Sequence, residues 1–221
     1  MSWFANAFSS TIGKKVIMAL TGLFLVIFLL EHLLANFLLL SNDPHDFNAF
    51  SEFMSTNIFI RVAEYILFAG FIIHIVYAGI VTYKNSKARP IGYAVNHPND
   101  NSTWVSRNMG LTGAILLVFL LVHLNSFFFP HKLPNPISGH AVLEPYQDAH
   151  DKFSNPLYTA FYVVCMLILA FHLNHGFQSS FQTLGARHPK YTPIIKVLGW
   201  GFSILVPLGF AFIPLYILLT R

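Results

Sequence analysis

The sequence predicts an all-α, polytopic membrane protein with five transmembrane helices. Of its 221 residues, 55% are hydrophobic and only 10% are Asp, Glu, Lys or Arg, whereas a soluble globular domain has about 25% charged residues. The mean hydropathy of +0.58 agrees with this composition. So few charged side chains cannot cover a surface that faces water, and lipid must therefore surround much of the chain. The one cysteine, Cys165, excludes a disulfide framework and a CxxC metal or redox site.

Five apolar segments are each long enough to cross the bilayer core, which needs about 20 residues in a helix. In lipid only helices and closed barrels satisfy every backbone polar group, and long apolar runs without strict alternation are helices. The expected spans are about 15–40, 60–83, 107–129, 157–178 and 196–219. Pro130 is expected to end the third span. Residues 1–221 are therefore expected to form a single integral membrane domain.

Basic residues set the expected orientation, because the cytoplasmic segments of membrane proteins carry an excess of Lys and Arg. One side holds nine of the 13 basic residues: Lys14, Lys15, Lys84, Lys87, Arg89, Arg107, Arg187, Lys190 and Lys196. The other side holds Arg61, Lys132, Lys152 and Arg221, together with six acidic residues. The N-terminus is therefore expected in the cytoplasm and the C-terminus outside, which agrees with an odd number of spans.

Spans one and three share an internal repeat. The thirteen residues from Thr21 to Leu33 match those from Thr112 to Leu124 at eight positions. Leu and Phe are abundant in any membrane helix, so part of this match reflects composition. The shared Thr-Gly start, and the histidine eleven residues after each Thr, are more specific. The repeat suggests that spans one and three occupy equivalent places in a helix bundle.

Histidines are the main functional signal. Six of the 11 lie in expected loops, where an ordinary solvated role accounts for them: His45, His97, His131, His140, His150 and His188. The other five lie within spans, where ionisable groups usually face the bundle interior and mark function. A hydrogen bond to a neighbouring helix explains one such histidine equally well. It is a poorer explanation for one in each of four consecutive spans, at His32, His74, His123 and His172.

The depths of these histidines predict two sites. His32 and His123 lie 17 and 16 residues after the basic residues that begin their spans, about 25 Å along each helix. His74 and His172 lie towards the inner ends of spans that run in the opposite direction. In an up-down-up-down bundle, side chains from facing helices meet in the core and bind cofactors there. The sequence therefore predicts two coaxial pairs, His32 with His123 towards the outer face and His74 with His172 in the inner half.

Haem is the cofactor that two imidazoles from opposite helices suit best, because they serve as axial ligands of its iron. Zinc takes four ligands, and no acid or thiol accompanies each pair. A di-iron site needs paired Glu-x-x-His motifs, and a membrane desaturase would need dense histidine clusters, whereas His172 and His175 are the only close pair. Gly22, Gly70, Gly113 and Gly176 leave room for a porphyrin, although small residues equally serve helix packing.

The pattern resembles a known family. The motifs Phe171-His172-Leu-Asn-His-Gly176, Ile73-His74-Ile-Val-Tyr77 and Leu30-Glu-His32-Leu33, in this order, resemble the dihaem cytochrome b subunit that anchors bacterial succinate dehydrogenase and fumarate reductase. The resemblance covers essentially the whole chain, including five spans with histidines in the first four. Each motif is short, and their order and spacing are more specific than any one of them.

The resemblance implies two b-type haems in the bacterial cytoplasmic membrane. His74 and His172 would hold the haem nearer the cytoplasmic iron–sulfur subunit, and His32 and His123 the outer haem, with His175 as a neighbour of the inner haem. A flavoprotein subunit would oxidise succinate or reduce fumarate, and electrons would pass between the iron–sulfur subunit and a quinone, expected to be menaquinone, in the respiratory chain. Some relatives carry a proton-transferring glutamate where this sequence has Ala170, so that proton route is not expected here.

Two acids lie within the expected spans, where a carboxylate is expected to be functional or paired. Glu64 is expected to pair with Arg61, three residues before it. Glu31 is deeper and adjacent to His32. Quinone-linked proton transfer and a hydrogen bond to a neighbouring helix remain alternative roles for Glu31.

Two rival functions remain. The first is the dihaem anchor of another quinone-linked enzyme, such as a hydrogenase or another dehydrogenase. The second is a haem-free transporter in which the histidines relay protons. A transporter is expected to have broken helices near substrate-binding polar groups. Only span five, with Pro207 and Pro214, is expected to be broken, and it contains no ionisable group.

Overall fold

The computed structural model describes residues 10–88, 102–132 and 144–220. These residues are almost entirely helical and include no strand, which confirms the all-α prediction. Five helical segments among them are long and apolar enough to span a membrane: Thr11–Leu40, Ile58–Lys87, Met109–Lys132, Pro156–Thr183 and Thr192–Thr220. Each one contains most of an expected span and extends it at one or both ends. The chain is therefore a multi-pass membrane protein.

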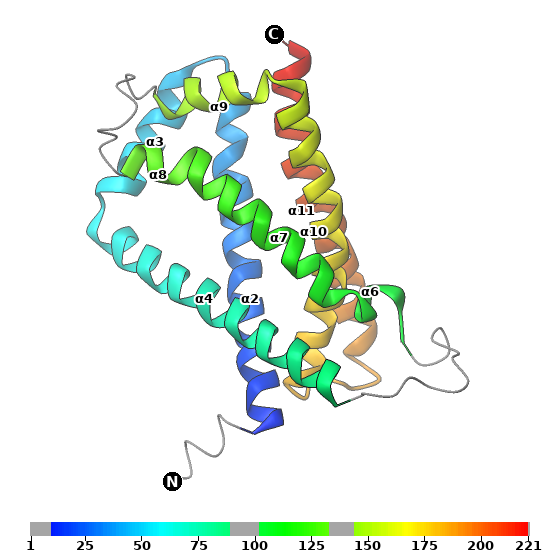
Figure 1. Cartoon of the computed structure of the whole chain (residues 1–221). Coiled ribbons are helices and arrows are strands. Elements are labelled where there is room, and N and C mark those ends of the chain that lie inside the picture. Colours follow the sequence, from blue (N-terminus) through cyan, green and yellow to red (C-terminus); the bar gives the residue numbers. More distant parts are fainter. Residues whose placement is uncertain (1–9, 89–101, 133–143, 221) are drawn as a thin grey trace. The chain divides into compact units, whose positions relative to one another are not determined.

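The first span is the α-helix α2 (Thr11–Asn36), which tightens into the 3₁₀ turn η1 (Phe37–Leu40). The second is α4 (Ile58–Lys87), the fourth is α10 (Pro156–Thr183) and the fifth is α11 (Thr192–Thr220) (Figure 1). Arg89 and Arg221, two of the residues that set the expected orientation, lie outside the described residues, as do His97 and His140.

The third span changes its helical geometry immediately after His123. It consists of α7 (Met109–His123), a π-helical segment η2 (Leu124–Phe128) and α8 (Phe129–Lys132). The expectation that Pro130 ends this span is wrong, because the helix continues to Lys132. Proline has no N–H to donate to the preceding turn, and a π segment is a place where the regular ladder of hydrogen bonds is already interrupted. Such segments are frequent at functional sites.

The expectation that the fifth span is broken is also wrong. Helix α11 is continuous from Thr192 to Thr220 and contains both Pro207 and Pro214. Membrane helices tolerate proline when neighbouring helices and Ser or Thr side chains satisfy the freed backbone groups.

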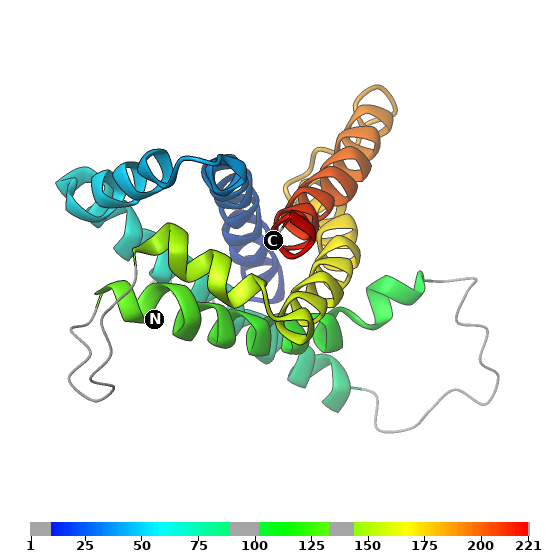
Figure 2. The same ribbon diagram turned by 90° about the horizontal axis from the view of Figure 1, so that it is seen from above.

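Short helices cover parts of the chain that the sequence reading treated as loops. These are α3 (Pro44–Thr56), α6 (Trp104–Arg107) and α9 (Pro145–Phe153). Helices α3 and α9 contact each other and lie side by side in Figures 1 and 2. The Tyr146 hydroxyl on α9 donates to the Ser41 carbonyl over 2.7 Å. Burial is the largest cause of the raised pKa of this tyrosine.

The described chain divides into two compact units. Unit 1 comprises Met1–Phe28, Tyr65–Gly113 and Phe171–Ser203, and unit 2 comprises Leu29–Glu64, Ala114–Ala170 and Ile204–Arg221. Each of the five spans contributes one segment to each unit. Helices α10 and α11 pack together within both, because Gly199 lies against Phe177 in unit 1 and Ala211 clusters with Cys165 in unit 2. The expectation of a single membrane domain stays a prediction.

Candidate functional site

The four candidate histidines fall into the two units as the expected pairs. His74 and His172 belong to unit 1, and His32 and His123 belong to unit 2. His172 and His175 lie about one turn apart on α10, and His74 on α4 belongs to the same unit. The rings of His32 and His123 lie with centroids 5.7 Å apart and planes almost perpendicular, at 89°, in a T-shaped arrangement.

A threonine hydroxyl holds His74. The Thr21 Oγ1 atom on α2 lies 3.3 Å from Nδ1 of His74 on α4. The same hydroxyl donates its hydrogen to the Ile17 carbonyl over 2.8 Å, one turn earlier in its own helix. Because a hydroxyl has one hydrogen to donate, a Thr21 hydroxyl that donates to Ile17 is an acceptor for the hydrogen of Nδ1. The Nε2 atom of a neutral His74 therefore keeps its lone pair, which is the form that binds a metal.

His172 has a matching partner on another helix. Oγ1 of Thr112 on α7 lies 3.2 Å from Nδ1 of His172 on α10. The Thr112 hydroxyl, on a residue that is 5% exposed, donates to the Met109 carbonyl over 3.1 Å. The same reasoning makes Thr112 an acceptor for Nδ1–H and leaves the Nε2 lone pair of His172 available. Within the described residues, no hydrogen bond reaches Nε2 of either histidine.

The glycine after each threonine lies against the same histidine. A Cβ atom added at Gly22 would be 3.5 Å from Cε1 of His74, and one added at Gly113 would be 3.6 Å from Cε1 of His172. Gly176, one turn after His172 on α10, has no atom within 4 Å of its Cβ position. Gly22 and Gly113 therefore let the backbones of α2 and α7 approach the two imidazoles closely, and the position beside Gly176 is open. The Thr-Gly repeat is visible in the sequence, but the contacts of its threonines with these histidines are not.

His123 lies among aromatic rings. Its Nδ1 atom is 3.2 Å from the hydroxyl of Tyr162, which accepts a hydrogen bond from the Tyr158 hydroxyl over 3.1 Å. Phe119 stacks on the imidazole at a centroid distance of 5.7 Å, and Phe127 lies at 5.5 Å. Phe127 belongs to the π segment that begins directly after His123. This segment therefore places an aromatic ring against the candidate ligand.

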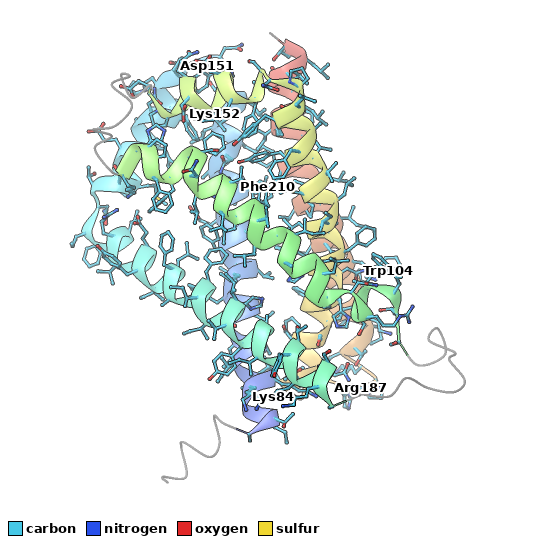
Figure 3. All side chains as sticks on the ribbon, viewed as in Figure 1. Lys84, Trp104, Asp151, Lys152, Arg187 and Phe210 are labelled. Carbon is cyan, nitrogen blue, oxygen red and sulfur yellow. The ribbon has the colours of Figure 1, made fainter. Side chains whose placement is uncertain are left out.

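His32 has a different partner. Its Nδ1 atom lies 3.4 Å from Nδ2 of Asn36, and that amide nitrogen also donates to the His32 carbonyl over 2.7 Å. The ring of Phe210, which Figure 3 labels, packs against the imidazole at a centroid distance of 5.6 Å. Ring packing and its own helix thus both contribute to holding His32. Neither Asn36 nor Tyr162 was identified from the sequence.

The two acids of the spans have separate environments. Arg61 donates from Nη1 to both carboxylate oxygens of Glu64, over 3.1 and 3.0 Å, which confirms the expected pair. Lys132 adds an ion pair to the same carboxylate at 3.0 Å, which the sequence reading did not predict. Glu31 is exposed on α2 and makes no hydrogen bond or ion pair with any other described residue. The described part of this chain therefore offers Glu31 no hydrogen-bond partner on a neighbouring helix.

Two histidines outside the two pairs, His131 and His150, have ordinary structural roles. His131 Nε2 lies 3.2 Å from the Asp148 carboxylate, which also contacts the Lys152 ammonium group. His150 contacts the Leu39 carbonyl through Nε2 at 3.1 Å and stacks on Tyr146. These contacts attach α9 to the end of the first and third spans within unit 2. Asp151 and Lys152 extend from α9 in Figure 3.

The donor set and spacing fit a haem. Two imidazoles complete the coordination of an iron whose four other ligands come from the porphyrin. A metal between two imidazole nitrogens forms bonds of about 2 Å to each, which places the ring centroids about 6 Å apart; His32 and His123 are 5.7 Å apart. Over the described ranges, no group of three or more His, Cys, Asp or Glu side chains is arranged to hold a metal ion. Gly22 and Gly113 keep side-chain bulk away from His74 and His172, as a bulky planar group at these ligands would require.

No protein-family model, curated protein or solved structure matches this chain.

Proposed function

We propose that this chain is a dihaem cytochrome b that anchors a succinate:quinone oxidoreductase in the membrane and relays electrons between an iron–sulfur subunit and quinone. The observation that carries the proposal is the pairing of four intramembrane histidines into two sets, one in each compact unit. The resemblance of the histidine motifs to the cytochrome b subunits of succinate dehydrogenase and fumarate reductase supplies the partner enzyme.

Each residue near a pair has a defined task in this proposal. His74 and His172 would hold one haem b, and His32 and His123 the other. A bound haem supplies a one-electron couple whose potential depends on its axial ligands and their surroundings. The aromatic rings around His123 exclude water from the site, because they fill the space beside the imidazole.

The charges of the two units support an assignment of sides. The described residues of unit 1 include no Asp or Glu, but they include Lys14, Lys15, Lys84, Lys87, Arg107, Arg187, Lys190 and Lys196; Figure 3 labels Lys84 and Arg187. By the positive-inside rule these residues face the cytoplasm. In this proposal the N-terminus is cytoplasmic, the membrane is the bacterial inner membrane, and the basic ends of the spans contact the iron–sulfur and flavoprotein subunits.

Quinone, with menaquinone as the expected type, reacts at the end of the relay away from the soluble subunits. Glu31 is the candidate group for quinone-linked proton transfer, because it is exposed on α2 and adjacent in sequence to the proposed ligand His32. Quinones reach such a group directly from the lipid. Ala170 provides no carboxylate for the alternative route of some relatives.

Affinity purification of the tagged chain from its native membrane tests this proposal. A flavoprotein and an iron–sulfur protein should co-purify, and succinate should reduce b-type haem in the complex until a quinone analogue reoxidises it. Co-purification of a hydrogenase or of another dehydrogenase would support the haem assignment but would assign the chain to a different enzyme. A complex without a Soret band would contradict the whole assignment and favour the histidine proton relay of a transporter.

A further inference from the structure

The strongest unassigned feature is the pair of threonine contacts in unit 1. Thr21 on α2 and Thr112 on α7 each place a hydroxyl within 3.3 Å of Nδ1 of a histidine on another helix. The two contacts involve the same residue type at the same position of an internal repeat. In unit 2 the Nδ1 contacts are with an amide for His32 and with a phenol for His123.

Each threonine hydroxyl can accept from its histidine while it donates to its own helix. Its hydrogen is directed to a carbonyl of the preceding turn, Ile17 for Thr21 and Met109 for Thr112. Threonine commonly forms this bond within a helix. The backbone carbonyl thus fixes the hydroxyl, the hydroxyl fixes the imidazole tautomer, and Nε2 of each ring is left as the metal-binding nitrogen.

The histidine ligands of metals usually donate their second ring N–H in this manner. The partner fixes the ring orientation and raises the basicity of the ligand, and its loss typically weakens metal binding or activity about 10- to 100-fold. A more basic imidazole donates more electron density to iron and stabilises its oxidised form. Removing the acceptor should therefore raise the reduction potential.

We propose that Thr21 and Thr112 are positioning residues that fix the tautomers of His74 and His172 and lower the reduction potential of the haem between them. This inference rests on the proposed haem function. It adds the means by which the chain gives the two haems different reduction potentials. The adjacent Gly22 and Gly113 complete the contact by bringing the backbone of each helix close to the same ring.

The test is a spectroelectrochemical titration of the full-length, haem-loaded protein. Thr112→Val keeps the branched shape and removes the acceptor, whereas Thr112→Ser keeps a hydroxyl. At a fixed ambient potential, the valine variant should increase the ratio of reduced to oxidised haem about tenfold for one of the two haems, which corresponds to about 59 mV for one electron. The serine variant should restore the wild-type ratio.

A second pair of variants identifies the haem that moves. Thr21→Val should shift the same haem as Thr112→Val, and the shift should persist in a His123→Ala background, where the haem of unit 2 is removed. If Thr112→Val alone loses the haem of unit 1 while Thr112→Ser keeps it, the hydroxyl is required for binding, which also supports the inference.

Two results would overturn the inference. One is a pair of unchanged potentials in Thr112→Val and Thr21→Val proteins that bind two haems. The other is loss of haem in the serine variant as well as the valine variant, because a hydroxyl would then be insufficient. Wild-type protein that binds no haem would instead contradict the proposed function itself.

Discussion

The two histidine pairs differ in how their rings are held. In unit 1, hydroxyls from α2 and α7 accept from Nδ1 of His74 and His172 and fix the tautomer of each ring. In unit 2, aromatic rings surround His32 and His123, and the polar partner of His123 is the Tyr162 phenol. A phenol both donates and accepts, so the chain from Tyr158 through Tyr162 is compatible with either tautomer of His123.

This difference shows two ways to prepare a histidine for a cofactor. A threonine hydroxyl that donates to its own helix presents an oxygen acceptor to the imidazole before any cofactor binds. Aromatic packing fixes the plane and position of a ring but leaves its hydrogen free to move. The two haem sites should therefore respond differently to the loss of a ligand, of space, or of a hydrogen-bond partner.

Removal of a ligand should have the largest effect. His74→Ala and His123→Ala should each reduce the haem content from two per chain to one, because each variant leaves one pair intact. Haem can be counted by the pyridine haemochrome assay. His175→Ala is the matched control, since His175 neighbours His172 but is not proposed as a ligand, and it should keep both haems. Loss of both haems in either ligand variant would mean that the pairs do not bind independently.

Filling the space beside His172 should affect only unit 1. Gly113→Val would add atoms next to Cε1 of His172, where an added Cβ already lies at 3.6 Å, and it should abolish the haem of unit 1 while keeping that of unit 2. Gly79→Val is the control, because nothing lies within 4 Å of its Cβ position. Two haems in the Gly113→Val protein would show that the porphyrin does not occupy this space.

Removal of the phenol hydroxyl should weaken the site of unit 2 without destroying it. Tyr162→Phe keeps the ring that packs beside His123 and removes the partner of Nδ1. In a His74→Ala background, which retains only the haem of unit 2, we expect haem affinity to fall about tenfold. Transfer of haem to an apo-globin measures the affinity. An unchanged affinity would mean that aromatic packing alone positions His123.

The smallest expected effect is the loss of stability when an ion-pair network of unit 2 is removed. The described residues of unit 1 contain no acidic side chain and therefore no such network. Glu64→Gln removes the charge that Arg61 and Lys132 share, at a side chain that is 18% exposed. Partial exposure reduces the cost to about 1–2 kcal/mol of unfolding free energy. Thermal unfolding in detergent should show this loss with both haems retained. Exposed Glu52→Gln is the control and should leave the unfolding temperature unchanged.

Hydropathy was sufficient to predict the five spans, because each has a long apolar run with few charges. It gave no indication of α3 and α9, which are polar helices that depend on tertiary contacts such as Tyr146 with Ser41. Proline was an unreliable boundary, since Pro130, Pro207 and Pro214 all lie within helices. Proline often ends a helix in a soluble protein, but a membrane helix can continue through it.

The site was predictable only at the level of the histidines. Their repetition in four spans indicated the pairs. The residues that contact Nδ1 are Thr, Asn and Tyr, and in a membrane helix these residue types are explained equally well without any contact to a histidine. Thr21 and Thr112 had a visible signal in the repeat. Each lies three turns before the histidine of its own helix and cannot contact that histidine, so its repetition points to a contact with another helix. Asn36 and Tyr162 had no comparable signal, since an amide one turn after a histidine and a tyrosine in an aromatic-rich helix are both common.

The central claim is that each unit binds one haem between its two histidines. The most direct test is a pyridine haemochrome count per polypeptide on the purified wild-type chain. The account predicts two b-type haems per chain. A chain without haem would contradict the claim, and a count of one would show that one of the two histidine pairs serves only the structure.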